Sequence, residues 1–155
     1  MIQLESIDNI FKSFAAKLDE LSLAELNKIP EGFNNNIIWN FGHAIESSYS
    51  LAFARPKVDE SYQNPSLEKY KKGTRPEADA TKDEVEQLKS LAFNYSKTIS
   101  SAIEQGKFEN ITPYSTGTFG AELKTIDDIL TTILAHNTLH FATASAQARI
   151  IRKQE

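Results

Sequence analysis

The stretch TIDDILTTILAHNTLHFATASAQARIIRK, residues 125–153, has the periodicity of one long amphipathic helix. Its core-facing positions recur at steps of three or four: Ile126, Ile129, Ile133, His136, His140, Thr143, Gln147 and Ile150. His136 and His140 lie four residues apart on this face, just over one helical turn, so both imidazoles can converge on one metal ion. The stretch therefore predicts a helix that directs two metal ligands toward the interior.

Three other segments, residues 4–21, 36–55 and 81–106, repeat the helical pattern of apolar positions. The second ends before Pro56, which lacks the amide that a further turn would need. A polar connection of about 25 residues separates the second helix from the third, long enough to run the height of a helix bundle. We therefore expect an all-α fold: a four-helix bundle with a long crossover between helices two and three. We expect a single domain over residues 1–155.

The two long connections carry weaker signals. Residues 66–72 predict a brief helix inside the crossover, and residues 107–124 predict an ordered loop over one end of the bundle. The crossover also contains a short basic cluster followed by acidic residues: Lys69, Lys71, Lys72, Arg75, Glu77 and Asp79. The simplest interpretation of this charge run is a solvated loop.

The third and last histidine of the chain, His43, lies in the second predicted helix. If the second and fourth helices are neighbours, His43 can join His136 and His140 in one site. Three imidazoles on a four-coordinate ion leave one position open, which distinguishes a catalytic or binding site from a closed structural one. Zinc or nickel would suit such a site, and iron or manganese are alternatives, because the ligands alone do not select the metal.

A simpler interpretation of the histidines is that each is a core residue satisfied by one hydrogen bond. Against it, two imidazoles on a buried face must each satisfy a donor and an acceptor, at about 1–3 kcal/mol per unsatisfied group. A shared metal would satisfy both. Each ligating ring usually donates its other N–H to a nearby acceptor. Asn40 or Glu46 could serve His43, and Asn137 or Thr132 could serve the fourth helix.

Composition excludes several classes of function. A net charge of −4 and the lack of an extended basic face argue against nucleic acid as a partner. Without cysteine the chain has neither disulfides nor a thiolate of its own. We see neither a signal peptide nor an apolar run of the ~20 residues that a membrane span needs, so we expect a cytoplasmic protein with no membrane partner. No serine nucleophile or glycine-rich phosphate loop can be assigned, so catalytic and cofactor-binding residues stay unidentified.

Three motifs carry a family likeness: NIIWNFGH (residues 36–43), KYKKGTRP (69–76) and HNTLH (136–140), the last followed by Gln147 and RIIR (149–152). Together they resemble the DinB-like superfamily, which contains damage-inducible proteins and thiol-dependent transferases of the YfiT type. The resemblance implies an up-down-down-up four-helix bundle, a homodimer, and a divalent metal held by His43, His136 and His140. The chain departs from the usual pattern at Asn137, where members often have an acidic residue, and at Phe141-Ala142-Thr143.

Two functions from different classes follow. The first is a metal-dependent enzyme acting on small molecules. It would be either a transferase that uses a low-molecular-weight thiol as co-substrate, as the resemblance implies, or a hydrolase that uses metal-bound water. The second is a non-catalytic stress-response or small-ligand-binding bundle that holds the metal without turnover.

Overall fold

The computed structural model describes residues 1–59 and 61–153. Its helical elements are α1 (Ile2–Asp19), α2 (Leu23–Asn27), α3 (Ile37–Tyr49), the π-helical η1 (Ser50–Ala54), the 3₁₀-helical η2 (Pro65–Tyr70), α4 (Lys82–Glu104) and α5 (Ile126–Lys153). The strands β1 (Tyr114–Ser115) and β2 (Glu122–Leu123) pair antiparallel, Tyr114 with Leu123 and Ser115 with Glu122. The chain is mostly helical, which confirms the all-α prediction.

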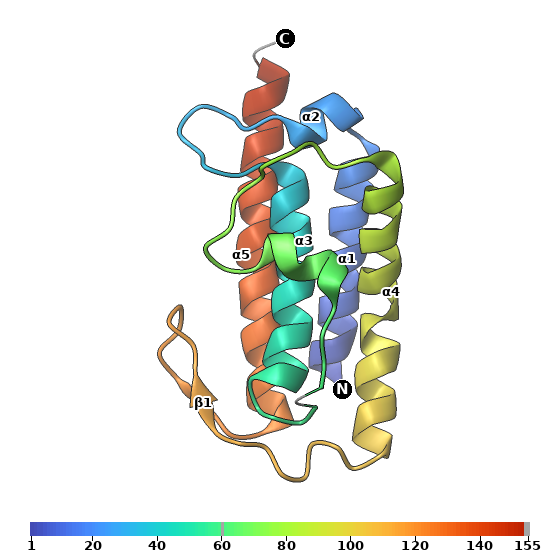
Figure 1. Cartoon of the computed structure of the whole chain (residues 1–155), viewed down its shortest axis with the longest axis vertical. Helices are drawn as coiled ribbons and strands as arrows, with labels where there is room; N and C mark the ends of the chain where they lie inside the picture. The colour runs from blue at the N-terminus through green and yellow to red at the C-terminus, as the bar shows by residue number, and fades with distance from the viewer. Residues whose placement is uncertain (60, 154–155) are drawn as a thin grey trace.

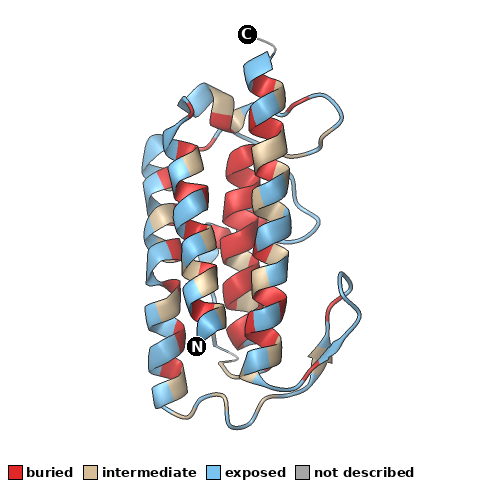
Figure 2. Ribbon diagram, turned by 180° about the vertical axis from the view of Figure 1, so that it is seen from behind, coloured by how far each residue is buried: buried red, intermediate tan, exposed pale blue. Residues whose placement is uncertain are grey.

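The long helices α1, α3, α4 and α5 lie side by side (Figure 1). Both α1 and α3 contact α4 and α5, and the buried faces turn toward one another (Figure 2). Aromatic rings fill part of this core: Phe11 of α1 meets Tyr95 of α4 edge-on at 5.9 Å, and Phe14 lies 5.0 Å from Phe41 of α3. Burying each such ring contributes roughly 1.5–3 kcal/mol. Among the described residues, no helix combines the length and apolarity needed to cross a membrane.

Side-chain caps fix where the helices begin. The Asn36 side chain accepts a hydrogen bond from the Trp39 amide at 2.8 Å and so starts α3, and Thr81 caps α4 through the Glu84 amide. Thr125 and Asp128 exchange two hydrogen bonds at the start of α5, the reciprocal pattern of a capping box. The second predicted helix ends differently from expectation. Its last turn, η1, is π-helical rather than α-helical.

The crossover between α3 and α4 packs along α3, with η2 lying across its outer side (Figure 1). The brief helix predicted there is η2. Gly42 permits this packing, because a Cβ built at that position would overlap the ring of Tyr70. With the crossover on one side and α5 and α4 on the others, every residue of α3 except Glu46 is buried. The crossover therefore lies against the helix that carries the candidate ligand His43.

The predicted loop 107–124 contains the β1–β2 hairpin, which projects beside the lower part of α5 in Figure 1. Two contacts hold the hairpin to η1 and to Arg55, the residue that follows it. The Tyr114 hydroxyl donates to the Leu51 carbonyl at 2.5 Å, and Arg55 Nη2 donates to the Ser115 carbonyl at 2.9 Å. These contacts bring the hairpin tip close to the face shared by α3 and α5.

Candidate metal centre

The structure brings the three histidines of the chain together across the contact between α3 and α5. One ring nitrogen from each of His43, His136 and His140 lies within 4.8 Å of the others, a grouping that could hold a metal ion. Their ring centroids are 4.6–5.2 Å apart. The prediction that helices two and four bring these residues into one cluster is thus confirmed.

The rings are less deeply buried than expected. His43 is buried, but His136 and His140 are only half-buried and line a pocket that opens to the surface. Among the described residues, every buried side-chain nitrogen and oxygen has a hydrogen-bond partner. The cost of an unsatisfied imidazole in a sealed core therefore does not favour a metal here. What favours a metal here is the convergence of three ring nitrogens beside an open pocket.

His43 is oriented by the crossover. Its Nδ1 lies 2.7 Å from the carbonyl oxygen of Tyr70, and because a carbonyl only accepts, Nδ1 must carry the proton. The lone pair is then on Nε2, which lies 3.4 Å from the Ser47 hydroxyl. The acceptor predicted for His43, Asn40 or Glu46, was wrong. A backbone carbonyl from a distant segment fills that role.

His140 is oriented by Asn40, whose Oδ1 lies 2.8 Å from His140 Nδ1. The Asn40 amide is itself fixed, because its Nδ2 donates to the Asn36 carbonyl at 2.9 Å and to Gln147 Oε1 at 3.1 Å. Gln147 Nε2 in turn donates to the Asn35 carbonyl at 2.9 Å. These side-chain amide bonds leave Asn40 Oδ1 as the acceptor. His140 therefore also carries its proton on Nδ1, and the lone pair on its Nε2 is free to bind a metal.

His136 is the least constrained of the three rings. Its nearest polar partner is Asn137 Oδ1, at 3.5 Å from Nδ1, the limit of a hydrogen bond. Asn137 is fully buried and donates to the Ser48 hydroxyl at 3.0 Å. The predicted partnership with Asn137 is therefore weak, and Thr132 lines the pocket instead. His136 can turn to meet a ligand more easily than the other two.

Burial lowers the pKa of all three imidazoles. The pKa of His136 falls to about 4, mainly through burial and then through the neighbouring His43. The pKa of His140 falls to about 3, again mainly through burial, with contributions from His136 and His43. The pKa of His43 is lowered by the same main cause. All three rings are neutral at physiological pH, which is the form that binds metals.

The pocket above the histidines has a volume of about 420 Å³. Its floor comes from α3 and α5, and its walls come from the hairpin tip at residues 116–119 and from three cationic side chains, Arg55, Lys71 and Lys72. Glu46, the half-buried residue of α3, also lines it, and burial raises the pKa of this carboxyl. Lys71 and Lys72 are exposed, as the interpretation of the basic cluster as a solvated loop predicted, and they also line this pocket.

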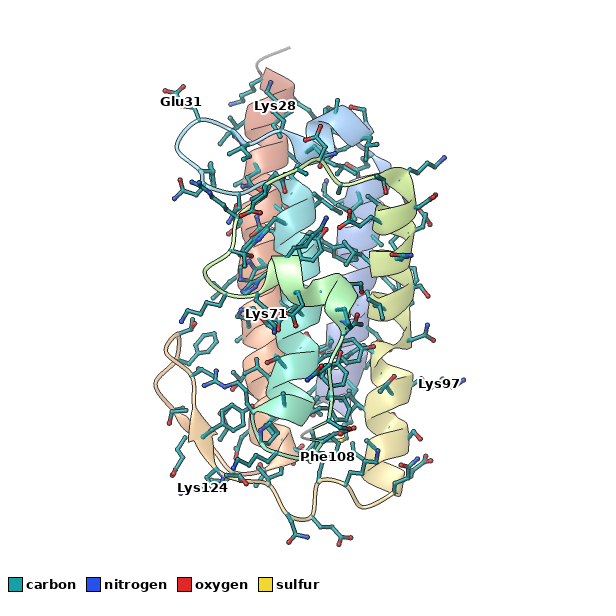
Figure 3. The ribbon with its side chains drawn as sticks, in the orientation of Figure 1. Lys28, Glu31, Lys71, Lys97, Phe108 and Lys124 are labelled. Atoms are coloured by element: carbon teal, nitrogen blue, oxygen red, sulfur yellow. The ribbon has the colours of Figure 1, made fainter. Side chains whose placement is uncertain are left out.

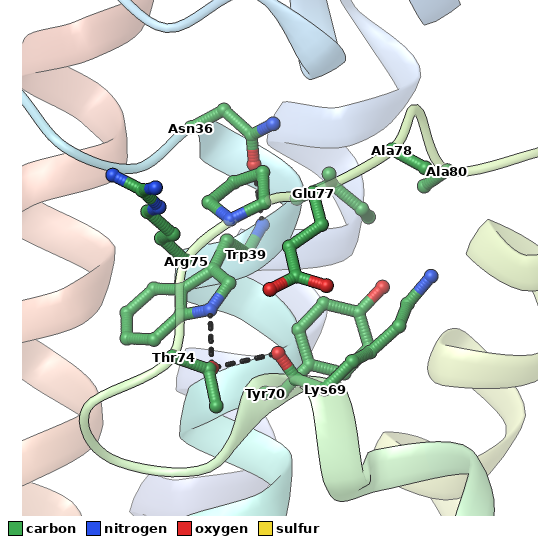
Figure 4. A pocket seen from close by; sticks show the side chains of 11 residues that line it. Asn36, Trp39, Lys69, Tyr70, Thr74, Arg75, Glu77, Ala78 and Ala80 are labelled. Atoms are coloured by element: carbon green, nitrogen blue, oxygen red, sulfur yellow. Dashed lines mark hydrogen bonds between the residues drawn. The ribbon is translucent and has the colours of Figure 1, made fainter.

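Trp39 separates this pocket from a second cavity. Its indole stacks on His43, with ring centroids 4.7 Å apart and planes 10° from parallel, and Nε1 donates to the Thr74 hydroxyl at 3.0 Å. The second cavity, of about 280 Å³, is lined by Trp39, Tyr70 and the residues that follow Thr74 (Figure 4). Trp39 therefore contributes to both the packing of the histidine cluster and the wall of a neighbouring cavity.

Fold and site together define a mainly helical protein with a candidate three-histidine metal centre at the floor of a surface pocket. The model of the DinB superfamily matches residues 8–144 of the chain, most of its length. The protein belongs to the DinB superfamily, which confirms the resemblance drawn from the sequence motifs. No match was found among curated proteins.

Proposed function

We propose that the protein binds one divalent metal ion through Nε2 of His43 and His140 and a ring nitrogen of His136. The observation that carries this proposal is the convergence of three neutral imidazoles whose ring nitrogens lie within 4.8 Å of one another. Two of the rings have their Nδ1 protons committed to the Tyr70 carbonyl and the Asn40 amide oxygen. Such orientation of ligating histidines by outer acceptors is usual in metal sites.

Zinc or nickel fits this ligand set best. Imidazole suits both ions, whereas manganese prefers carboxylate and water oxygens. The clustered ligands found among the described residues are all imidazoles, with no carboxylate in the group. Iron remains an alternative because it also accepts imidazole.

We further propose that the metal-loaded protein is an enzyme acting on small molecules, of the thiol-dependent transferase type. A pocket of about 420 Å³ accommodates a small molecule beside the histidines. A bound divalent ion would lower the pKa of a coordinated thiol or water. Since the chain has no cysteine, the thiol would come from a low-molecular-weight co-substrate. The role of the three histidines would be to hold the ion while leaving a position open to the pocket.

A hydrolase is the close variant, and Glu46 favours it. Its carboxyl lines the pocket, and its raised pKa suits a group that accepts and returns a proton. A non-catalytic binding protein is the alternative from a different class. It is favoured by the absence, among the described residues, of any carboxylate hydrogen-bonded to the three imidazoles.

The experiment is a screen of zinc- and nickel-loaded protein. Low-molecular-weight thiols paired with electrophiles test transfer, and esters and amides test hydrolysis. His140→Ala should abolish either activity, and Glu46→Gln should reduce hydrolysis while Glu31→Gln, an exposed loop change, should not (Figure 3). Full metal occupancy without turnover in either screen would support the binding protein. Turnover that survives in His140→Ala would contradict the metal's role.

We also propose the architecture expected of the superfamily: one domain over residues 1–155, an up-down-down-up bundle, and a cytoplasmic homodimer. The course of the chain in Figure 1 supports the bundle, because α3 and α4 run in one direction and α1 and α5 in the other. Light scattering tests the dimer. A mass near twice the 17.4 kDa of one chain is expected, and a mass of one chain would contradict it.

A further inference from the structure

The pocket above the histidines has a cationic side formed by two segments far apart in the sequence. Arg55 follows η1 at the end of the second helix, and Lys71 and Lys72 follow η2 in the crossover. In Figure 3, Lys71 projects from the crossover where it passes α3. The fold thus brings three cations to the pocket whose floor holds His43, against a single lining carboxyl, Glu46, in the described part of the chain.

Of the three cations, Lys71 has an acidic partner, whereas Arg55 and Lys72 do not among the described residues. Lys71 is paired with Glu68 at 2.7 Å, and it also lies near enough to Glu46 to influence that carboxyl. Arg55 donates to the Ser115 carbonyl at 2.9 Å and lies over the Tyr114 ring at 5.0 Å, contacts that position the guanidinium without neutralising it. Neither Arg55 nor Lys72 has an ion-pair partner within the described ranges.

Both charges lie beside the hairpin that forms one wall of the pocket. A Cβ built on Gly117 would lie 3.5 Å from Lys72 Nζ, so the ammonium is next to the hairpin tip. The neighbouring lip is apolar: Phe119 of the hairpin and Leu139 of α5 are 42% and 51% exposed, although both line the pocket. One side of the entrance therefore offers positive charge and another offers apolar surface.

A metal held by three neutral imidazoles keeps its full double positive charge, which adds to the same field. The pocket as a whole is consequently suited to a negatively charged ligand. From this distribution we infer that Arg55 and Lys72 bind the carboxylate of a small organic acid, while the apolar part of the ligand packs on Phe119 and Leu139. This inference rests on the proposed function, since it names the substrate class of the same pocket: carboxylate-bearing thiols or acids.

The test compares two thiols of equal chain length by calorimetry, 3-mercaptopropionate and the neutral 3-mercaptopropanol. The parent protein, loaded with zinc and checked for metal content, should bind the acid about tenfold more tightly, and added salt should reduce this preference. The Arg55→Gln, Lys72→Gln double variant should bind both thiols equally while its metal content stays unchanged. Lys97→Gln, at an exposed position that points away from the other helices in Figure 3, should behave like the parent.

Succinate binding to the metal-free protein separates this inference from the metal proposal. If no metal binds, succinate affinity that falls in the double variant still establishes the carboxylate site. A parent protein that binds both thiols equally, or a double variant that keeps the preference for the acid, would overturn the inference. So would succinate affinity in the metal-free protein that is the same with and without Arg55 and Lys72.

Discussion

Replacing Asn40 with alanine tests whether the amide chain of α3 and α5 holds His140 in place. Asn40 is 1% exposed, so water does not readily replace its hydrogen bonds. Its removal would leave the His140 Nδ1–H and Gln147 Oε1 without partners. Asn40 Nδ2 also donates to the Asn36 carbonyl and to Asn35 Oδ1. Both acceptors keep a partner in the variant, because the Asn36 carbonyl still accepts from the backbone amide of residue 40 and Asn35 Oδ1 still accepts from Gln147 Nε2.

Two orphaned groups at about 1–3 kcal/mol each predict that Asn40→Ala lowers the free energy of unfolding by about 2–6 kcal/mol. Loss of the orienting acceptor should also weaken metal binding about 10–100-fold. Urea unfolding of the metal-free protein measures the first quantity, and metal titration measures the second. Asn94→Ala is the matched control, since Asn94 is exposed and its side chain donates to Ser90 of the same helix. Equal stability and equal metal affinity in the two variants would refute the role of Asn40.

Three further predictions concern the groups around the histidines. Gly42→Ala should cost about 1–3 kcal/mol and weaken metal binding, because the new methyl group displaces Tyr70 and its carbonyl from His43. The metal-free protein should lose stability as the pH falls below 6.5, since the unfolded histidines of α5 take up protons there while the folded ones, with pKa values of about 4 and about 3, do not. Above pH 6.5 both states are neutral and this contribution vanishes. Nickel should quench the emission of Trp39, the only tryptophan, because its ring stacks on His43 at 4.7 Å.

Each of these predictions has its own control. Gly117→Ala, where the added Cβ meets only ordinary contact at 3.5 Å, should leave stability and metal affinity near the parent values. For the pH dependence, His140→Gln should reduce the slope by up to about 1.4 kcal/mol per pH unit, measured by urea unfolding at several pH values. An unchanged slope would show that His140 is not buried in its neutral form. Nickel quenching that persists in His43→Ala would place the ion elsewhere.

The parts of the site that were predictable from the sequence depend on local periodicity. Spacing by four places His136 and His140 on one face of any helix, and caps such as Asn36 and Thr81 mark helix starts through short-range bonds. His43 could be added because a bundle brings neighbouring helices together. These inferences need only the geometry of a single helix and one assumption about packing.

The remaining features depend on the path of the crossover and could not be predicted. The acceptor for His43 is the backbone carbonyl of Tyr70. Because every residue has such a carbonyl, the residue type gives no indication of this role. Asn40 looked like a partner for His43 on its own helix, yet it reaches across to His140 because its amide is tied to Gln147 of α5. Lys72 is exposed, as the charge run predicted, but only the path of the crossover brings it to the pocket.

Metal analysis of the parent protein and of a His43→Ala, His136→Ala, His140→Ala triple variant tests the central claim most directly. Both proteins, untagged, would be incubated with zinc, nickel, manganese and iron and freed of excess ion before elemental analysis. The account predicts about one equivalent of zinc or nickel in the parent and none in the triple variant. No bound metal in the parent, or equal metal in both proteins, would contradict it and make the three histidines ordinary residues of the helix interface.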